Sequence, residues 1–128
     1  MKKLISIIVL FFALSGISQT FKTNVNAQTF KKLIEEKKHV LIDLRTDDEI
    51  KTKGKIKGAT QINFLDKTAE EQINKLDKQK GYLIYCAGGG RSADCADLME
   101  QQGFKTIINL EKGFSDWQKN GFEIEKIN

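Results

Sequence analysis

Residues Gly81 to Ser92, GYLIYCAGGGRS, decide the fold of this chain. An apolar and aromatic run, typical of a buried strand, leads Cys86 into a glycine-rich turn, and Arg91 then leads into a helical pattern. A junction of strand, loop and helix turns several backbone N–H groups inward at the positive end of a helix dipole, which is how proteins bind anions. Such donors lower the pKa of a nearby thiol and make it nucleophilic. The stretch therefore predicts a reactive cysteine suited to anionic sulfur chemistry.

Strand-like and helix-like patterns alternate along the rest of the chain. We expect helices at residues 27–37, 47–52, 68–76, 92–102 and 114–117, and strands at residues 40–44, 59–62, 83–85 and 106–110. Such alternation implies right-handed crossovers and a central parallel sheet that helices cover on both faces. The sequence has no internal repeat. We therefore predict a single α/β domain over residues 19–128, closed by an extended segment at 121–127.

A few residues mark where helices should begin or end. Asn26 is a favourable N-cap for the first helix. Thr68 and Glu71 have the spacing of a capping box. Gly103 is typical of the position just after a helix.

The strand patterns also suggest where a ligand binds. In open parallel sheets, ligands bind beyond the carboxyl ends of the strands. Asp43 and Cys86 both stand at such ends. Their side chains are therefore expected to face the same crevice.

The first eighteen residues have the three-part pattern of a secretory signal peptide. Lys2 and Lys3 give a basic start, residues 4–14 are apolar, and small residues follow at 15–18. The apolar run is shorter than the roughly 20 residues of a transmembrane helix. We expect residues 1–18 to be cleaved and the mature domain to be periplasmic or secreted, free of the membrane. An uncleaved membrane anchor is the alternative.

Charge and composition exclude several function classes. The net charge of +4 comes from lysines spread along the chain and interleaved with glutamate or glycine. The aromatic residues do not alternate with a basic stripe, so nucleic acid is not an expected partner. The single histidine belongs to no cluster with metal-ligand spacing, so we expect no metal and no cofactor.

The two cysteines are expected to be unpaired thiols. Cys95 follows Cys86 by nine residues and lies inside a predicted helix. A helical rise of about 1.5 Å per residue puts their Cα atoms near or beyond the ~7 Å limit for a disulfide. Cys95 shares the inward face with Met99, which favours a small buried hydrophobe. A resolving thiol that pairs with Cys86 under oxidation is the alternative.

Four short motifs make the chain resemble a single-domain rhodanese of the exported type, in the sulfurtransferase family. In chain order they are Asp43-Leu44-Arg45 with Glu49, GKIKGA at residues 54–59, the cysteine loop CAGGGRS at residues 86–92, and the LEKG at residues 110–113 that leads to Trp117. The resemblance covers residues 25–122. It implies the three-layer rhodanese fold, in which helices flank both faces of a central parallel sheet.

Three positions depart from the pattern of the family. Lys55 stands where histidine is usual, and Lys112 replaces the first glycine of a pair. We interpret both as structural substitutions. Ala87 follows the cysteine where many thiosulfate-using relatives have arginine, which leaves Arg91 as the fixed positive charge of the loop. The sequence therefore supports thiosulfate as a donor less strongly than other sulfur donors.

The resemblance implies a sulfurtransferase that works through a persulfide on Cys86. It would move a sulfane sulfur from a small anionic donor, thiosulfate or another persulfide source, to a thiol or cyanide. The thiolate and the persulfide are expected to bind the backbone N–H groups of the loop, those of Ala87, Gly88, Gly89, Gly90 and Arg91. Successive glycines would permit the dihedral angles that turn these groups inward. We expect the protein to be a monomer.

Loop length separates this chain from the related phosphatases. Those enzymes have one more residue between cysteine and arginine than the four found here, and their wider loop suits a tetrahedral oxyanion. Phosphatase activity is not expected. A module on the same fold that carries a persulfide without turnover, or only binds a partner, is the alternative function.

Supporting roles are expected for three charged residues. Asp43 is expected to accept hydrogen bonds from the loop or its neighbours, since persulfide transfer needs no strong base. Arg45 is expected to pair with Glu49 and brace the segment after its strand. Arg91 has two interpretations, binding the anionic part of the donor or pairing with an acidic neighbour, and we favour a mixed role.

Overall fold

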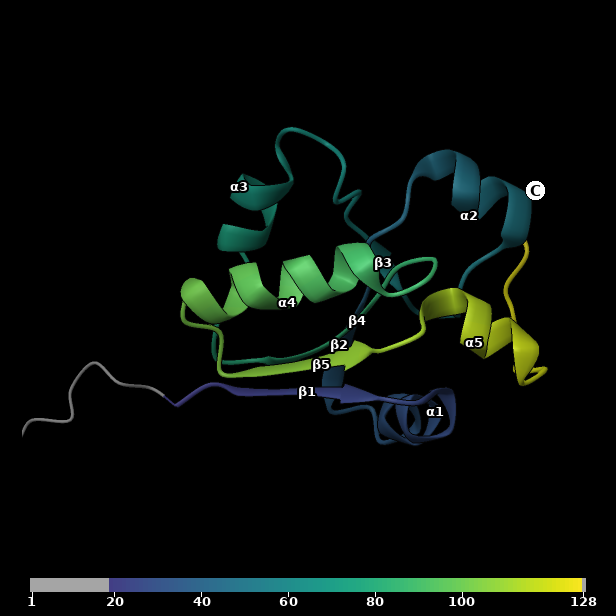
Figure 1. Ribbon diagram of the computed structural model, residues 1–128, viewed down its shortest axis with the longest axis horizontal. Helices are drawn as coiled ribbons and strands as arrows, with labels where there is room; N and C mark the ends of the chain where they lie inside the picture. Colours follow the sequence, from purple (N-terminus) through teal and green to yellow (C-terminus); the bar gives the residue numbers. More distant parts are fainter. Residues whose placement is uncertain (1–18, 128) are drawn as a thin grey trace, which may run out of the picture.

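A parallel sheet runs through the middle of the molecule, with its strands in the order β1-β5-β4-β2-β3 (Figure 1). The computed structural model describes residues 19–127, so the predicted signal peptide lies outside the described residues and stays a prediction. The five strands are β1 (Phe21–Val25), β2 (His39–Asp43), β3 (Thr60–Gln61), β4 (Gly81–Tyr85) and β5 (Thr106–Leu110), and every pairing is parallel. The predicted α/β fold class is confirmed.

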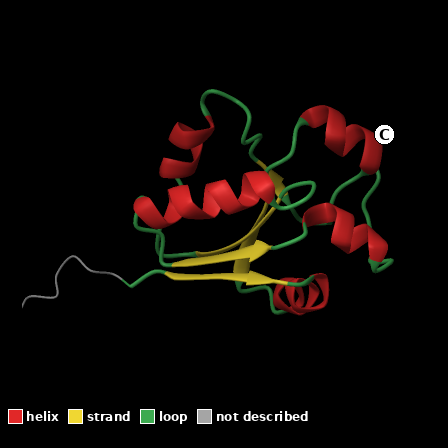
Figure 2. Cartoon of the chain, in the orientation of Figure 1, coloured by secondary structure: helices red, strands yellow, loops and turns green. Residues whose placement is uncertain are grey.

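Helices cover both faces of the sheet (Figure 2). They are α1 (Ala27–Glu35), α2 (Asp47–Lys53), α3 (Ala69–Asn74), α4 (Gly90–Gln101) and α5 (Gly113–Lys119). The helices α3 and α4 pack on one face, and α1 and α5 pack on the other. The helix α2 lies beyond the carboxyl ends of the strands (Figure 1). The cysteine loop extends from the same end of the sheet.

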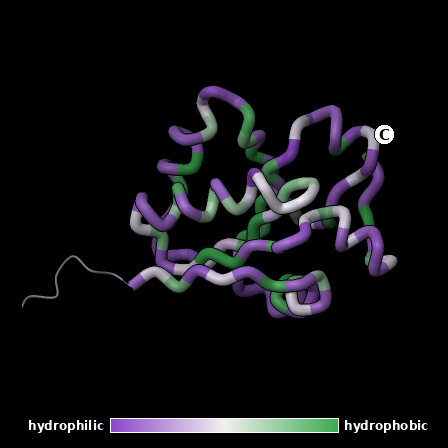
Figure 3. The backbone as a smooth tube through the Cα atoms, in the orientation of Figure 1, coloured by the Kyte–Doolittle hydropathy of each residue, from purple (hydrophilic) through white to green (hydrophobic). Residues whose placement is uncertain are grey.

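The central strand β4 supplies both hydrophobic cores through its alternation of side chains. Tyr82 and Ile84 join the core under α3 and α4, together with Cys86. Leu83 and Tyr85 join the core under α1 and α5. Figure 3 shows hydrophobic residues concentrated along the strands. A strand buried on both faces is a rigid support, so the residue that follows it is held firmly in place.

The helix-end signals are confirmed at two of three places. The Asn26 side chain accepts a hydrogen bond from the Thr29 N–H at 2.9 Å, and Gly103 has a φ of 87° just after α4. The capping box predicted at Thr68 is wrong, because Thr68 makes no cap hydrogen bond. Its hydroxyl instead donates to the Asp66 carboxylate at 2.7 Å.

The ends of the domain add detail that the sequence did not predict. The strand β1 was not predicted, because its sequence FKTNV lacks a clear alternation and it lies at the sheet edge, paired with β5 alone. The predicted extended segment at 121–127 makes one isolated bridge, between Glu125 and Lys55. Within residues 19–127, none of the helices has the length and apolar character needed to cross a bilayer.

Candidate active site

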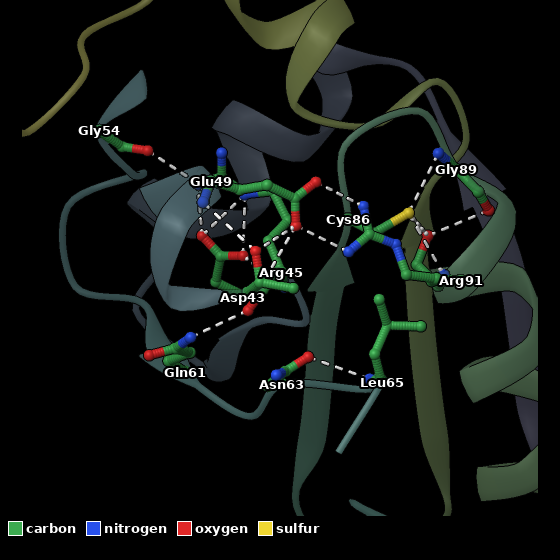
Figure 4. A network of polar contacts seen from close by, with 12 residues as sticks. Asp43, Arg45, Glu49, Gly54, Gln61, Asn63, Leu65, Cys86, Gly89 and Arg91 are labelled. Atoms are coloured by element: carbon green, nitrogen blue, oxygen red, sulfur yellow. Dashed lines mark hydrogen bonds and ion pairs between the residues drawn. The ribbon is translucent and has the colours of Figure 1, made fainter. Parts of the chain in front are cut away.

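The cysteine loop follows the central strand β4 and ends in the first turn of α4 (Figure 4). Within this loop the Gly89 N–H donates to the Cys86 Sγ at 3.1 Å, and the Ser92 N–H donates to it at 3.4 Å. The Ser92 Oγ also lies 3.4 Å from the sulfur. The sulfur is therefore surrounded by donors from its own loop, as expected for a site that binds an anion.

Gly89 is the glycine whose conformation this loop requires. Its φ of 109° lies in the left-handed region, and a Cβ there would stand 2.0 Å from the Glu111 carbonyl oxygen. Gly88 and Gly90 have no such φ, and a Cβ on either would meet no atom within 4 Å. The expectation that all three glycines supply unusual dihedrals is thus wrong. Gly88 and Gly90 instead leave the outer side of the loop open.

The start of α5 fixes the other side of the loop. The Phe114 N–H donates to the Cys86 carbonyl at 2.8 Å, and the Ser115 N–H donates to the Ala87 carbonyl at 3.0 Å. Gly113 permits this close approach, because a Cβ there would stand 2.5 Å from the Ala87 carbonyl oxygen. The carbonyls of Cys86 and Ala87 thus point toward α5 and away from the sulfur, which leaves the sulfur facing N–H groups.

Opposing effects act on the pKa of Cys86. Burial raises it, since the residue is 1% exposed and the charged thiolate loses contact with water. Hydrogen bonds from the Ser92 hydroxyl and N–H and from the Gly89 and Gly88 N–H groups lower it. The hydrogen bonds outweigh burial, so the pKa of Cys86 lies below its usual value. A lower pKa raises the fraction of nucleophilic thiolate near neutral pH.

Glu49 forms a bidentate ion pair with Arg91 across the mouth of the site (Figure 4). The two N–O distances are 2.8 and 2.7 Å, and each side chain is partly exposed. The hydrogen bond from Arg91 lowers the pKa of Glu49 to about 2, against an opposing effect of burial. Of the two interpretations of Arg91, the structure thus shows the pairing with an acidic neighbour.

Arg45 pairs with Asp43 and not with Glu49, which corrects the prediction. The Arg45 Nη2 lies 2.7 Å from an Asp43 carboxylate oxygen, and both side chains are essentially inaccessible to solvent. The Tyr85 hydroxyl donates to the same carboxylate at 2.5 Å. Arg45 Nη2 also donates to the Gly54 carbonyl at 2.8 Å, and the guanidinium stacks 4.0 Å from the Phe114 ring.

Asp43, Arg45 and Tyr85 form a buried group of hydrogen-bonded side chains, the Asp43 network, which supports the cysteine loop. Asp43 makes no hydrogen bond with the loop itself. Its partner Tyr85 immediately precedes Cys86, and Phe114, which stacks on Arg45, holds the Cys86 carbonyl. The network thus contacts the residue before Cys86 and the residue that binds its carbonyl.

Cys95 is a separate, buried thiol. It lies on α4 in the core below the loop, is 1% exposed, and forms no disulfide with Cys86. Burial and the nearby Cys86 raise the pKa of Cys95 to about 12. It is therefore uncharged near neutral pH, which agrees with its interpretation as a small hydrophobe.

A small pocket of about 90 Å³ opens beside Ala87. Phe114 and Ser115 line one side of it, and Glu49 and Lys53 from α2 line another. Across residues 19–127, no group of three or more histidine, cysteine or acidic side chains is placed to hold a metal ion.

The structure brings together most of the predicted site and adds one residue. Ser92, which the sequence places only at the start of a helix, donates its N–H to the sulfur and places its hydroxyl 3.4 Å from it. The amides of Ala87, Gly90 and Arg91 are not hydrogen-bonded to the sulfur. A serine at the first turn of a helix, six residues after a cysteine, was the available signal, because N–H groups of a first turn have no partner within the helix.

Replacing Ser92 by alanine should slow alkylation of Cys86. The change removes the hydroxyl that lowers the pKa of the thiol, so less thiolate is present near neutral pH. A hydrogen bond contributes about 1 kcal/mol, so we expect the iodoacetamide rate to fall about fivefold. Ser115→Ala, at an exposed serine of α5, is the matched control. Equal rates for Ser92→Ala and the wild type would contradict this role of the hydroxyl.

The comparisons with known proteins agree with this geometry. The sequence model of the rhodanese-like domain family matches residues 26–120. The Bacillus subtilis protein YtwF is 35% identical over 95 residues, which are 73% of this chain and 88% of YtwF. The thiosulfate sulfurtransferase GlpE of Coxiella burnetii is 30% identical over 87 residues, which are 68% of this chain and 78% of GlpE.

The fold of this chain also resembles that of a solved structure. The polysulfide-sulfur transferase homodimer of Wolinella succinogenes matches with a TM-score of 0.69 and 27% identity. The match covers 84% of this chain and 80% of that one. Similarity extends over nearly the whole described domain, so it includes both the sheet and the loop at its carboxyl edge.

Proposed function

This chain belongs to the rhodanese-like domain family, and from that premise we propose that it transfers a sulfane sulfur through a persulfide on Cys86. Relatives of the chain are named sulfurtransferases, which supports rhodanese-type sulfur transfer at the level of the family. The observation that carries the finer proposal is the set of hydrogen-bonding groups around the Cys86 sulfur: the N–H groups of Gly89 and Ser92 donate to it, and the Ser92 Oγ lies 3.4 Å away.

The proposed reaction has two displacement steps. In the first, the Cys86 thiolate attacks the outer sulfur of a donor, such as thiosulfate. An S–S bond forms to Cys86, the S–S bond of the donor breaks, and sulfite leaves with the electron pair. In the second, a thiol or cyanide attacks the outer sulfur of the persulfide and restores the Cys86 thiolate, with thiocyanate as the product from cyanide. Such a covalent intermediate predicts ping-pong kinetics.

The loop supplies the same stabilisation to both forms of the cysteine. The thiolate and the persulfide each carry one negative charge close to the same donors from Gly89 and Ser92. Fixed dipoles aimed at the charge need no rearrangement during the reaction. Gly88 and Gly90 leave the approach to the loop free of side chains.

We further propose that the mature protein is an exported monomer. The pattern of residues 1–18 supports a cleaved signal peptide and a periplasmic or secreted location. N-terminal sequencing of protein purified from its native host tests this. A mature start near Gln19 is expected, and retention of Met1 would contradict cleavage.

Mass spectrometry of the purified protein tests the proposed function. After incubation with thiosulfate or a polysulfide, the protein should gain the mass of one sulfur atom on the peptide that contains Cys86. Cyanide should remove that mass and release thiocyanate. A protein that takes up sulfur but never returns it to cyanide or a thiol would contradict turnover and indicate a persulfide carrier.

A further inference from the structure

The sequence contains two arginines, and both lie beside the cysteine loop with their charges already matched. Arg45 is paired with Asp43 in the core, and Arg91 is paired with Glu49 at the mouth of the site. The residue after the cysteine, Ala87, carries no charge. A donor that reaches the loop therefore meets no guanidinium that lacks a carboxylate partner.

We propose that Glu49 is a specificity-determining residue that holds Arg91 in an ion pair and thereby favours persulfides of small thiols over dianionic donors such as thiosulfate. This inference rests on the proposed function and deepens it by naming the class of donor. Glu49 acts through Arg91 and through its own charge, and it takes no part in the transfer of sulfur.

The Glu49 carboxylate is held in place by its own helix. The Thr46 N–H donates to it at 2.9 Å, and the Thr46 hydroxyl donates to it at 3.0 Å, in the capping box that begins α2. The same carboxylate accepts both hydrogen bonds from Arg91. It therefore cannot turn away when an anion approaches, and its low pKa keeps it charged throughout the neutral range.

This fixed negative charge affects donors unequally. Thiosulfate carries two negative charges, so repulsion from Glu49 acts on both, and Arg91 would have to leave Glu49 to compensate. A small-thiol persulfide carries at most one negative charge at its sulfurs. In that case the Cys86 thiolate takes the outer sulfur of R–S–SH, the S–S bond of the donor breaks, and the R–SH thiol leaves with the proton.

The pocket beside Ala87 has a place for the carbon-containing part of such a donor. Its volume of about 90 Å³ lies next to the loop, against Phe114 and Ser115, and polar side chains complete its lining: Arg45, Glu49, Lys53 and Gln118. Thiosulfate has no carbon-containing group to place there, whereas an organic persulfide does.

Glu49→Gln tests the inference with little change of structure. Glutamine keeps the acceptor that the capping box needs and loses the charge. We expect kcat/KM with thiosulfate, relative to kcat/KM with the persulfide of 2-mercaptoethanol, whose organic part is uncharged, to rise about tenfold through a lower KM for thiosulfate. The ratio cancels any change in the thiolate fraction of Cys86, since that fraction affects both donors equally. Asp48→Asn, an exposed residue of the same helix, removes the same charge and should leave the ratio unchanged.

The possible outcomes distinguish the proposed role of Glu49 from the proposed sulfur transfer through Cys86. An unchanged or lower ratio in Glu49→Gln, or an equal rise in Asp48→Asn, would overturn the role of Glu49 and leave the persulfide on Cys86 intact. The double variant Glu49→Gln with Arg91→Gln should lose the gain, because no cation is then set free, and a retained gain would overturn the role of Arg91. If the wild type accepts sulfur from neither donor, the proposed function itself fails.

Discussion

Cys86→Ser is expected to abolish sulfur transfer, with a loss of at least about a thousandfold in turnover. An alcohol in place of the thiol keeps the size of the side chain, but it cannot form the proposed persulfide. The loop should remain folded, because its shape depends on Gly89, on the start of α5 and on the Asp43 network. Thiocyanate release from a sulfane donor and cyanide measures the loss.

Cys95→Ala is the matched control for the Cys86 variant. Cys95 is buried, and its raised pKa of about 12 keeps it uncharged near neutral pH, so it cannot replace Cys86 as the nucleophile. Its removal should leave the rate of thiocyanate release within about threefold of the wild type, since the substitution removes one buried atom away from the donors. Full activity in Cys86→Ser, or a sulfur adduct on Cys95, would contradict the assignment of the nucleophile.

Asp43→Asn is expected to lower the free energy of unfolding by about 3–5 kcal/mol. The substitution keeps the shape of the side chain but leaves the Arg45 guanidinium buried without its counter-charge. Domains of this size are stable by only about 5–15 kcal/mol, so the loss is a large share of the total. Urea unfolding followed by circular dichroism measures it.

Two further variants separate this effect from a general loss of charge. Asp48→Asn removes a carboxylate from the exposed face of α2, and it should cost less than about 1 kcal/mol. Adding Arg45→Met to Asp43→Asn removes the unpaired charge. The double variant should therefore lose less free energy of unfolding than the sum of the losses in the two single variants. A cost below about 1 kcal/mol for Asp43→Asn would show that the pair does not hold the domain together.

The parts of the fold that depend on local pattern were predictable from the sequence. The strand β4 and the loop after it were found because an apolar run, a cysteine and successive glycines are contiguous. The strand β5 was found at its observed bounds, because four of its five residues are apolar or β-branched. The edge strand β1 was not found, since its residues are mostly polar and its pairing with β5 joins segments far apart in the chain.

The charged partners of the site were only partly predictable. From the sequence, Arg45 was expected to pair with Glu49, which lies close to it along the chain. The chain turns after β2, so Arg45 folds back to Asp43, and Glu49 meets Arg91 from a segment 42 residues away. Spacing along the chain cannot show such a contact, because it depends on how α2 packs relative to α4. The capping box shows the same limit: the motif at Thr68 is not formed, whereas Thr46 and Glu49 form one.

The central claim is that donors of the loop hold the Cys86 sulfur as a thiolate. Titration of Cys86 by the ultraviolet absorbance of its thiolate, in the Cys95→Ala background, tests it most directly. The double variant that also lacks Cys86 supplies the baseline, and the chain unfolded in guanidinium supplies the reference pKa. We expect the pKa of Cys86 in the folded protein to lie below that reference. A folded value equal to or above the reference would contradict the account, because burial would then outweigh the hydrogen bonds from Gly89 and Ser92.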